Sequence, residues 1–290
     1  MSAGAVPAER PGVVAALRAA GCVFAEEEAA VLLAEATDPA SLADLVARRV
    51  AGEPLEVVVG WAAFCGLRVQ VGAGVFVPRR RTALLVEQAV AALRGTGRTP
   101  VVVDLCCGSG AVGLAVAVRA GPVELHAADV DPVAVGWARR NLAAVGGRVH
   151  RGDLYAALPA GLRGRVDLLA VNAPYVPTAA VALLPPEARD HEPRTALDGG
   201  PDGTALHRRV AAGARRWLAP GGTLLVETGA AQARVTAAAV RDGGLRAVVV
   251  HDEARDATVV AGTAPEDTVP GLARCAATHG GVSRDGPVAP

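Results

Sequence analysis

The residues most able to do chemistry are Asn172, Ala173, Pro174 and Tyr175, which follow the apolar run at 166–171. An amide or exocyclic amine nitrogen is a poor nucleophile because its lone pair is delocalised. A site that methylates one must hold the NH2 group with two acceptors and aim the nitrogen at the donor. The Asn172 carboxamide oxygen and the Ala173 carbonyl can supply these acceptors, and the Tyr175 ring can stack on the planar group. The same residues also suit an ordinary strand-end turn, where Asn and Pro are common.

A glycine-rich turn, DLCCGSG, lies upstream and continues into a Gly-x-Gly-x-x-Gly pattern, with Asp129 ending the next apolar run. Nicotinamide dinucleotides and S-adenosylmethionine (SAM) both use such glycines for close backbone approach and such an acid for ribose hydroxyls. Two details favour SAM. The segment before the first glycine is longer than in dinucleotide folds, and no strand pattern supplies a second nucleotide half. The candidate cofactor residues in this region are Asp104, Cys106, Gly108, Gly110 and Asp129.

A second cofactor contact is expected at Asp153 and Leu154, which follow the short strand pattern RVH. The carboxylate would lie near the adenine amino group, and Leu154 would lie against the adenine face. A loop acid without a ligand explains Asp153 equally well. Among the histidines, His191 and His207 are candidates for the entrance of the site, and none is assigned a catalytic role.

The composition excludes several classes of protein. The 29 basic residues, all Arg, balance 29 acidic ones, so whole-chain charge gives no argument for nucleic acid or an anionic membrane. Five cysteines form no C-x-x-C pair and lie near no histidine cluster, so we expect neither a metal site nor disulfides. The apolar run at 111–118 is too short for a membrane span, and the N-terminus lacks a signal-peptide pattern. These features predict a cytoplasmic protein.

The periodicity divides the chain into four parts. Residues 1–52 have helical spacing and predict a small helical domain for docking the substrate. Residues 53–80 alternate around glycine turns, which predicts a linker β-hairpin. Residues 81–263 predict the catalytic domain, and residues 264–290, rich in Pro, Gly, Ser and Thr, predict a disordered tail.

From residue 100 onward, apolar strand patterns alternate with helical ones. Such alternation predicts an α/β fold with a doubly wound, mostly parallel, Rossmann-like sheet. Ligands of such sheets bind beyond the carboxyl ends of the strands, which is where Asp104 and Asn172 fall.

Taken together, these motifs resemble the HemK-like protein-(glutamine-N5) methyltransferases over roughly residues 10–263. The segment from AGEPLEV to VFVPRRRT resembles the family's linker hairpin. DLCCGSG and HAADVDP resemble its SAM motifs, closest to the ribosomal-protein branch because of Cys106. VDLLAVNAPYVP resembles its Asn-Pro-Pro-Tyr motif, and HEPRTALDGGPDG and TLLVETG resemble its later Glu-Pro loop and fifth strand.

This resemblance implies a SAM-dependent enzyme that methylates the side-chain amide N5 of a glutamine in a protein. Asn172 and the Ala173 carbonyl would accept the two N–H bonds of the substrate amide, Pro174 would shape the turn, and Tyr175 would pack beside the amide. The glycine turn and Asp129 would hold SAM. The implied partner is a peptide chain release factor or a ribosomal protein, with no membrane and no specific nucleic-acid binding.

Three departures from the family pattern bear on the substrate. Ala173 stands where the family has its first proline, and Arg80 and Arg81 stand where it has a proline and an acid. The arginines predict a more basic rim, and the N-terminal helical region is shorter than in typical release-factor methyltransferases. Three alternatives remain: an adenine-N6 methyltransferase acting on nucleic acid, a small-molecule methyltransferase, and a SAM-binding module that has lost catalysis.

Overall fold

A seven-stranded sheet forms the centre of the computed structural model, which describes residues 10–95 and 97–266. The strand order is β5-β4-β3-β6-β7-β9-β8. The first five strands in this order are parallel, whereas β9 runs antiparallel to both β7 and β8. This topology confirms the predicted doubly wound α/β fold. The strands are β3 (Val101–Leu105), β4 (Glu124–Asp129), β5 (Arg148–Arg151), β6 (Val166–Val171), β7 (Leu218–Thr228), β8 (Arg246–Asp252) and β9 (Ala257–Thr263).

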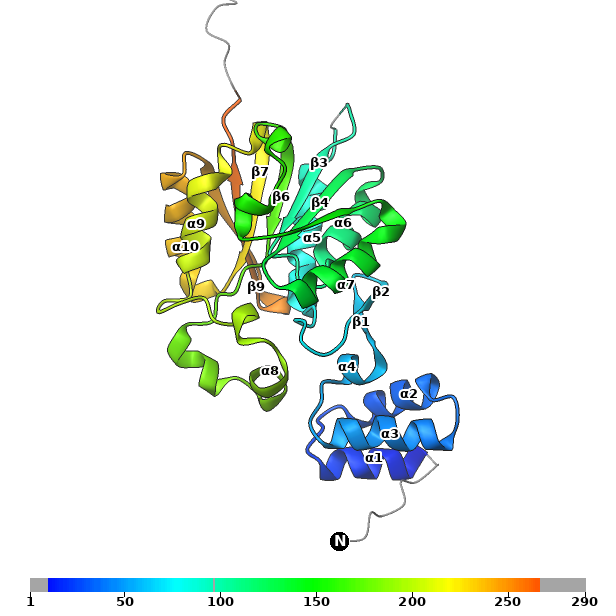
Figure 1. The fold of residues 1–290 in the computed structure, drawn as a ribbon. Coiled ribbons are helices and arrows are strands. Elements are labelled where there is room, and N and C mark those ends of the chain that lie inside the picture. The colour runs from blue at the N-terminus through cyan, green and yellow to red at the C-terminus, as the bar shows by residue number, and fades with distance from the viewer. Residues whose placement is uncertain (1–9, 96, 267–290) are drawn as a thin grey trace, which may run out of the picture.

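Helices cover both faces of this sheet (Figure 1). The helices α5 (Ala83–Ala92), α6 (Ala111–Ala120) and α7 (Pro132–Leu142) pack on one face, where Val102 of β3 points. The helices α9 (Ala205–Ala214) and α10 (Ala233–Asp242) pack on the other, together with Val101 and Val103. Because successive side chains of a strand point to opposite faces, an apolar run without alternation is what a strand covered on both sides requires.

Three N-terminal helices pack around an apolar cluster of their own. They are α1 (Arg10–Ala19), α2 (Ala25–Glu35) and α3 (Pro39–Val50). Helix α3 begins at Asp38, whose carboxylate accepts the Ser41 backbone N–H at 2.8 Å and so satisfies a free donor of the first turn. The short helix α4 (Leu55–Val59) then leads to an antiparallel hairpin of β1 (Trp61–Phe64) and β2 (Leu67–Gln70). The division into domains at residues 52, 80 and 263 stays a prediction.

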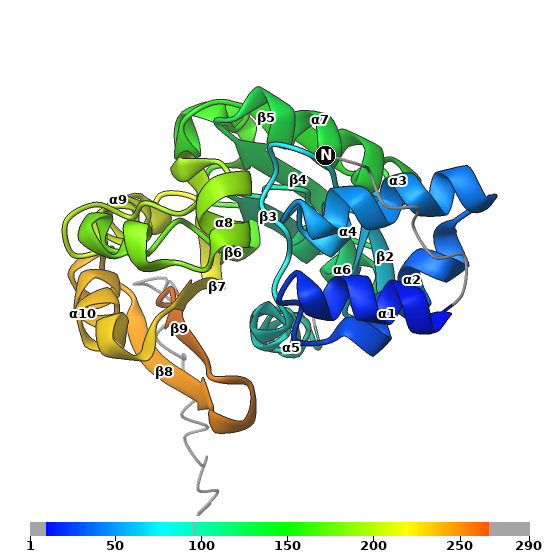
Figure 2. The same ribbon diagram turned by 90° about the horizontal axis from the view of Figure 1, so that it is seen from below.

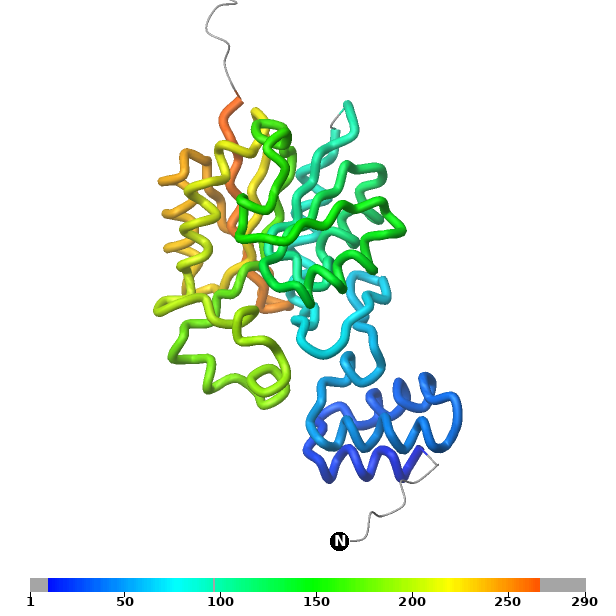
Figure 3. Tube along the Cα trace, viewed as in Figure 1, coloured from blue at the N-terminus to red at the C-terminus, as the bar shows by residue number. Residues whose placement is uncertain are grey.

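Between β6 and α9 the chain makes a long excursion, residues 178–198, which we call the strap. It contains η5 (Thr178–Leu183), α8 (Pro186–His191) and η6 (Arg194–Ala196). Figure 3 traces the strap from the sheet to the level of the N-terminal helices and back, and Figure 2 shows α8 from below. The end of the strap returns to the residues just before it, where Asp198 forms a bridge with Val176. The remaining 3-10 segments are η1 (Arg80–Thr82), η2 (Ala143–Val145), η3 (Leu154–Ala157), η4 (Ala160–Leu162), η7 (Ala230–Gln232) and η8 (Glu253–Arg255).

Ion pairs tie the strap to the N-terminal part of the chain. Glu192 accepts the Val77 backbone N–H at 3.0 Å and a guanidinium N–H of Arg79 at 2.6 Å. Glu187 lies 2.6 Å from Arg49 of α3. In the described part of the chain, no helix is both long enough and apolar enough to cross a membrane. The predicted tail lies outside the described residues from residue 267 onward.

Candidate active site

A cavity of about 390 Å³ lies at the carboxyl ends of the parallel strands, where β3 and β6 are neighbours. This is the point at which the strand order reverses, the usual ligand site of such sheets. Ten of the eleven site residues predicted from the sequence line this cavity, and Gly110 is the exception. Those lining it are Asp104, Cys106, Gly108, Asp129, Asp153, Leu154, Asn172, Ala173, Pro174 and Tyr175.

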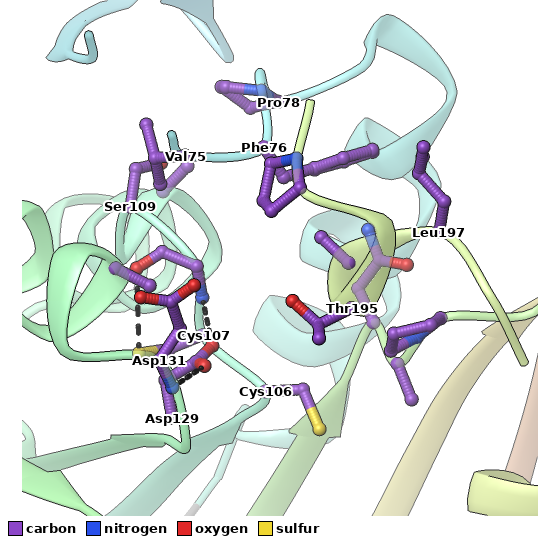
Figure 4. A pocket seen from close by; sticks show the side chains of 18 of the residues that line it. Val75, Phe76, Pro78, Cys106, Cys107, Ser109, Asp129, Asp131, Thr195 and Leu197 are labelled. Carbon is purple, nitrogen blue, oxygen red and sulfur yellow. Dashed lines mark hydrogen bonds between the residues drawn. The ribbon is translucent and has the colours of Figure 1, made fainter. Parts of the chain in front are cut away.

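Figure 4 shows how distant segments enclose the cavity. Asp129 and Asp131 lie beside the glycine turn, while Thr195 and Leu197 of the strap lie across from them. Phe76, from the segment after β2, completes the wall. The segment before the parallel sheet and the loops between its strands therefore both contribute to one site.

We call the turn between β3 and α6 the cofactor side, because the sequence predicts that it holds SAM. Cys106 and Gly108 have positive φ angles of 59° and 53°, so the chain reverses sharply there. A Cβ added at Gly108 would meet no atom within 4 Å, which leaves the backbone open to a ligand. Asp129 lies opposite, where one carboxylate oxygen accepts the Gly108 N–H at 2.9 Å and the other accepts the Asp131 N–H at 3.0 Å. Each oxygen keeps acceptor capacity for a hydroxyl group.

Two of the predicted cofactor residues, Asp104 and Gly110, stabilise this turn through their contacts with α6 and α7. Asp104 is 2% exposed, and its carboxylate accepts the backbone N–H of Gly113 at 2.8 Å in the first turn of α6. Burial raises the pKa of Asp104 to about 8. Gly110 has a φ of 78°, and an added Cβ would lie 3.1 Å from Leu142 and 3.3 Å from Ala138. Gly110 therefore allows α6 and α7 to approach each other.

The predicted adenine contacts lie at the end of β5. Leu154 is 9% exposed and has a φ of 48°, which is unusual for a residue with a side chain. Asp153 is more exposed, and its carboxylate lies 2.6 Å from the Arg209 guanidinium. Both residues line the cavity, and their contact with adenine stays a prediction.

The acceptor side is the turn after β6. The Asn172 side chain donates an N–H to the Thr82 hydroxyl at 3.4 Å, so its carboxamide oxygen is not committed to that contact. The Tyr175 hydroxyl donates to a Glu227 carboxylate oxygen at 3.2 Å. The Tyr175 backbone carbonyl accepts an N–H from Gln232 at 2.8 Å, which anchors the turn to the segment after β7.

Of the two arginines predicted to make the rim more basic, Arg81 lines the cavity and Arg80 does not, and the basic rim stays a prediction. Arg79 pairs with Glu192, and Arg81 lies 3.6 Å from Glu227, with its guanidinium 5.7 Å from the Tyr175 ring centroid. Their charges are therefore paired with buried carboxylates, whereas Arg80 is exposed and does not line the cavity.

One of the two histidines proposed for the entrance is buried. His207 is fully buried behind Tyr175, with ring centroids 6.2 Å apart, and its Nδ1 lies 2.9 Å from the Thr236 hydroxyl. Burial lowers the pKa of His207 to about 4, so the ring is neutral at physiological pH. The entrance assignment was wrong for this residue because α9 packs directly on the sheet.

Sequence reasoning missed Thr82 and Glu227, which contact the acceptor residues from behind. Glu227 did leave a signal, since it is an acid within the otherwise apolar end of TLLVET. An acid at a position that must be buried requires partners, and such residues mark functional sites. Thr82 gave no comparable signal.

Comparison with known proteins agrees with this geometry. The family model described as "Methyltransferase small domain" matches residues 67–184. Two release factor glutamine methyltransferases are similar to the chain. The one from Streptomyces coelicolor is 43% identical over 63% of this chain and 66% of its own length. The one from Mycolicibacterium smegmatis is 42% identical over 74% of this chain and 77% of its own length.

A third relative carries a different name. The 4-amino-L-phenylalanine/4-methylamino-L-phenylalanine methyltransferase of Streptomyces pristinaespiralis is 38% identical over 64% of this chain and 65% of its own length. Among solved structures, the release-factor-specific protein-(glutamine-N5) methyltransferase of Alicyclobacillus acidocaldarius is 23% identical. The structural match covers 65% of this chain and 94% of the Alicyclobacillus acidocaldarius chain, with a TM-score of 0.41.

The fold, the cavity and the sequence matches all indicate the same family. The parallel sheet places a SAM-type glycine turn and the Asn-Ala-Pro-Tyr turn in one cavity. The M. smegmatis match extends over three quarters of both chains. The chain therefore belongs to the HemK-like protein-(glutamine-N5) methyltransferase family.

Proposed function

We propose that this chain transfers a methyl group from SAM to the side-chain amide N5 of a glutamine in a peptide chain release factor. The observation that carries the proposal is the shared cavity, in which the Asn172–Tyr175 turn faces the same space as the glycine turn and Asp129. The release factor glutamine methyltransferases that are 38–43% identical to this chain support the release factor as substrate.

The residues at the glycine turn fit SAM. Gly108 offers an open backbone, and Asp129 offers two carboxylate oxygens with acceptor capacity for ribose hydroxyls. The cavity volume of about 390 Å³ lies within the ordinary range for small-molecule and cofactor sites. SAM supplies the electrophilic methyl group, and the chain's own residues supply orientation and charge stabilisation.

The acceptor turn holds the amide nitrogen. The Asn172 oxygen and the Ala173 carbonyl accept the two N–H bonds, which directs the nitrogen lone pair at the methyl carbon. As the N–C bond forms and the S–C bond breaks, positive charge develops on nitrogen, and both acceptors stabilise it. The N–H then becomes acidic and its proton leaves to solvent, so no strong base is required. Positioning of this kind supplies most of the rate, with effective molarities of ~10⁵ M or more.

A second acceptor class has a specific observation in its favour. One relative is named as a methyltransferase of 4-amino-L-phenylalanine, whose amine is attached to an aromatic ring. An arylamine nitrogen is also planar and weakly nucleophilic, so the same two acceptors suit it. The cavity walls contain Phe76 and Tyr175, against which a ring can pack.

The test is mass spectrometry of purified release factor, ribosomal proteins and 4-amino-L-phenylalanine after separate incubations with the chain and SAM. We expect one added methyl group on a single glutamine of the release factor. Methylation of the arylamine alone would transfer the assignment to the small molecule. SAM binding in calorimetry without transfer to any of the three would contradict the proposal and favour a binding module.

A further inference from the structure

Behind the acceptor turn lies a row of buried polar groups that the sequence motif does not contain. Thr82 is 1% exposed and directly precedes α5 as its N-cap residue, while Glu227 is 2% exposed and lies near the end of β7. Thr82 contacts Asn172 through its hydroxyl at 3.4 Å, and Glu227 contacts the Tyr175 hydroxyl at 3.2 Å. The two residues therefore hold the first and last members of the Asn-Ala-Pro-Tyr turn.

Each of these two residues has one hydrogen-bonding group still to satisfy. The Thr82 hydroxyl accepts from Asn172, so its own proton needs an acceptor. The second oxygen of Glu227, Oε2, is buried and has no hydrogen-bond partner among the described residues. An unsatisfied buried group costs about 1–3 kcal/mol, which favours any pairing that geometry permits.

Among the groups that act on the Glu227 carboxylate, the Thr82 hydroxyl is the one that also contacts Asn172. Burial raises the pKa of Glu227, while the Thr82 hydroxyl, Arg81 and Tyr175 act to lower it. Pairing the free Thr82 proton with the free Glu227 oxygen would satisfy both groups. The resulting chain has one direction, from the Asn172 N–H through the Thr82 O–H to the Glu227 carboxylate.

We propose that Thr82 and Glu227 are positioning residues that fix which end of the Asn172 carboxamide faces the substrate. The inference rests on the proposed function, because orientation matters only if the Asn172 oxygen must accept an N–H bond. With its nitrogen held by Thr82, the carboxamide presents its oxygen to the cavity. Rotated by half a turn, it would present an NH2 group to the substrate NH2, and two donors would face each other.

The protonation state of Glu227 sets the direction of this chain. An ionised carboxylate only accepts, so it forces the Thr82 proton toward itself and leaves the Thr82 oxygen to accept from Asn172. Arg81, 3.6 Å from Glu227, is the cation facing that carboxylate, and Tyr175 donates to it. His207, behind Tyr175, is neutral. Arg81 thus has a role in this chain that an acid at the same position could not fill.

The matched variants are Thr82→Val, which keeps the shape and removes the hydroxyl, and Thr82→Ser, which keeps the hydroxyl. We expect Thr82→Val to lower kcat about tenfold to thirtyfold, while the Kd for SAM changes less than twofold. Thr82→Ser should stay within about threefold of the wild type. Glu227→Gln, whose amide can donate to Thr82 and reverse the chain, should lower kcat as Thr82→Val does. A kcat unaffected by Thr82→Val and Glu227→Gln would overturn the inference.

A second measurement reads the orientation without turnover. In NMR spectra, the Asn172 side-chain amide, assigned by its absence in Asn172→Ala, should show one N–H protected from solvent exchange in the wild type and in Thr82→Ser. The protection should disappear in Thr82→Val, and its persistence there would overturn the inference. If the wild type methylates nothing, the proposed function fails, and the exchange data still decide the role of Thr82.

Discussion

The hydrogen bonds of the glycine turn, on the cofactor side of the cavity, join residues that are close in sequence, and those of the Asn172–Tyr175 turn, on the acceptor side, join residues that are far apart. Gly108 to Asp129 spans 21 positions and Asp104 to Gly113 spans 9, within consecutive strand-turn-helix units. Asn172 to Thr82 spans 90 positions, and Tyr175 to Glu227 spans 52. The glycine turn is therefore built by local chain geometry, and the acceptor turn by the assembled fold. Changes on the acceptor side should consequently lower kcat, and changes on the cofactor side should raise the Kd for SAM.

The largest effect is expected from Asn172→Ala. Removing one of two aligned acceptors for the developing charge should cost about 3 kcal/mol, or roughly 10²-fold in kcat, by analogy with the loss of one oxyanion-hole donor. The Kd for SAM, measured by calorimetry, should change less than twofold, because the glycine turn does not depend on this side chain. Equal losses in turnover and SAM binding would show that Asn172 maintains the fold and that the two sides are not separable.

The complementary change is Asp129→Ala. The proposed function has the Asp129 carboxylate accept ribose hydroxyls, and its loss should therefore weaken SAM binding by about 2 kcal/mol, or roughly 30-fold in Kd. At saturating SAM, kcat should remain within a few-fold of the wild type. Glu124→Ala is the matched control, since it removes an acid from the other end of the same strand. A control variant with the same loss of SAM affinity would refute a specific role for Asp129.

This contrast explains what the sequence could predict. The apolar runs and glycine turns determine strands, helices and the side of the sheet that binds ligands, so the doubly wound fold and the DLCCGSG turn were predictable. Contacts of Thr82 and Glu227 depend on how η1 and β7 meet across the sheet, which no local pattern encodes. The same holds for Arg81, where the sequence indicates a basic rim but not the carboxylate that it pairs with.

A smaller effect concerns Asp104 and stability. Its pKa of about 8 in the folded chain lies above its ordinary value of 3.8, so the native state binds a proton that the unfolded state releases. The resulting contribution to the free energy of unfolding is fully present below about pH 4 and is lost as pH rises toward 8. The free energy of unfolding of Asp104→Asn, relative to that of the wild type, should therefore rise by more than about 2 kcal/mol from pH 4 to pH 8. Urea unfolding without SAM measures this difference. An unchanged difference across this range would mean that Asp104 is ionised in the native state.

The smallest effect is expected from Ala173→Pro, which restores the residue that the family has at this position. Proline would fix φ near −65° and favour an extended conformation at Asn172, while keeping the carbonyl that accepts the substrate N–H. If remote contacts with Thr82, Glu227 and Gln232 already hold the turn, added local rigidity should change kcat less than about threefold. Fewer conformations in the unfolded chain should add up to about 1 kcal/mol of stability. A tenfold rise in kcat would instead show that local stiffness limits the acceptor side, and the distinction between locally and remotely built halves would not hold.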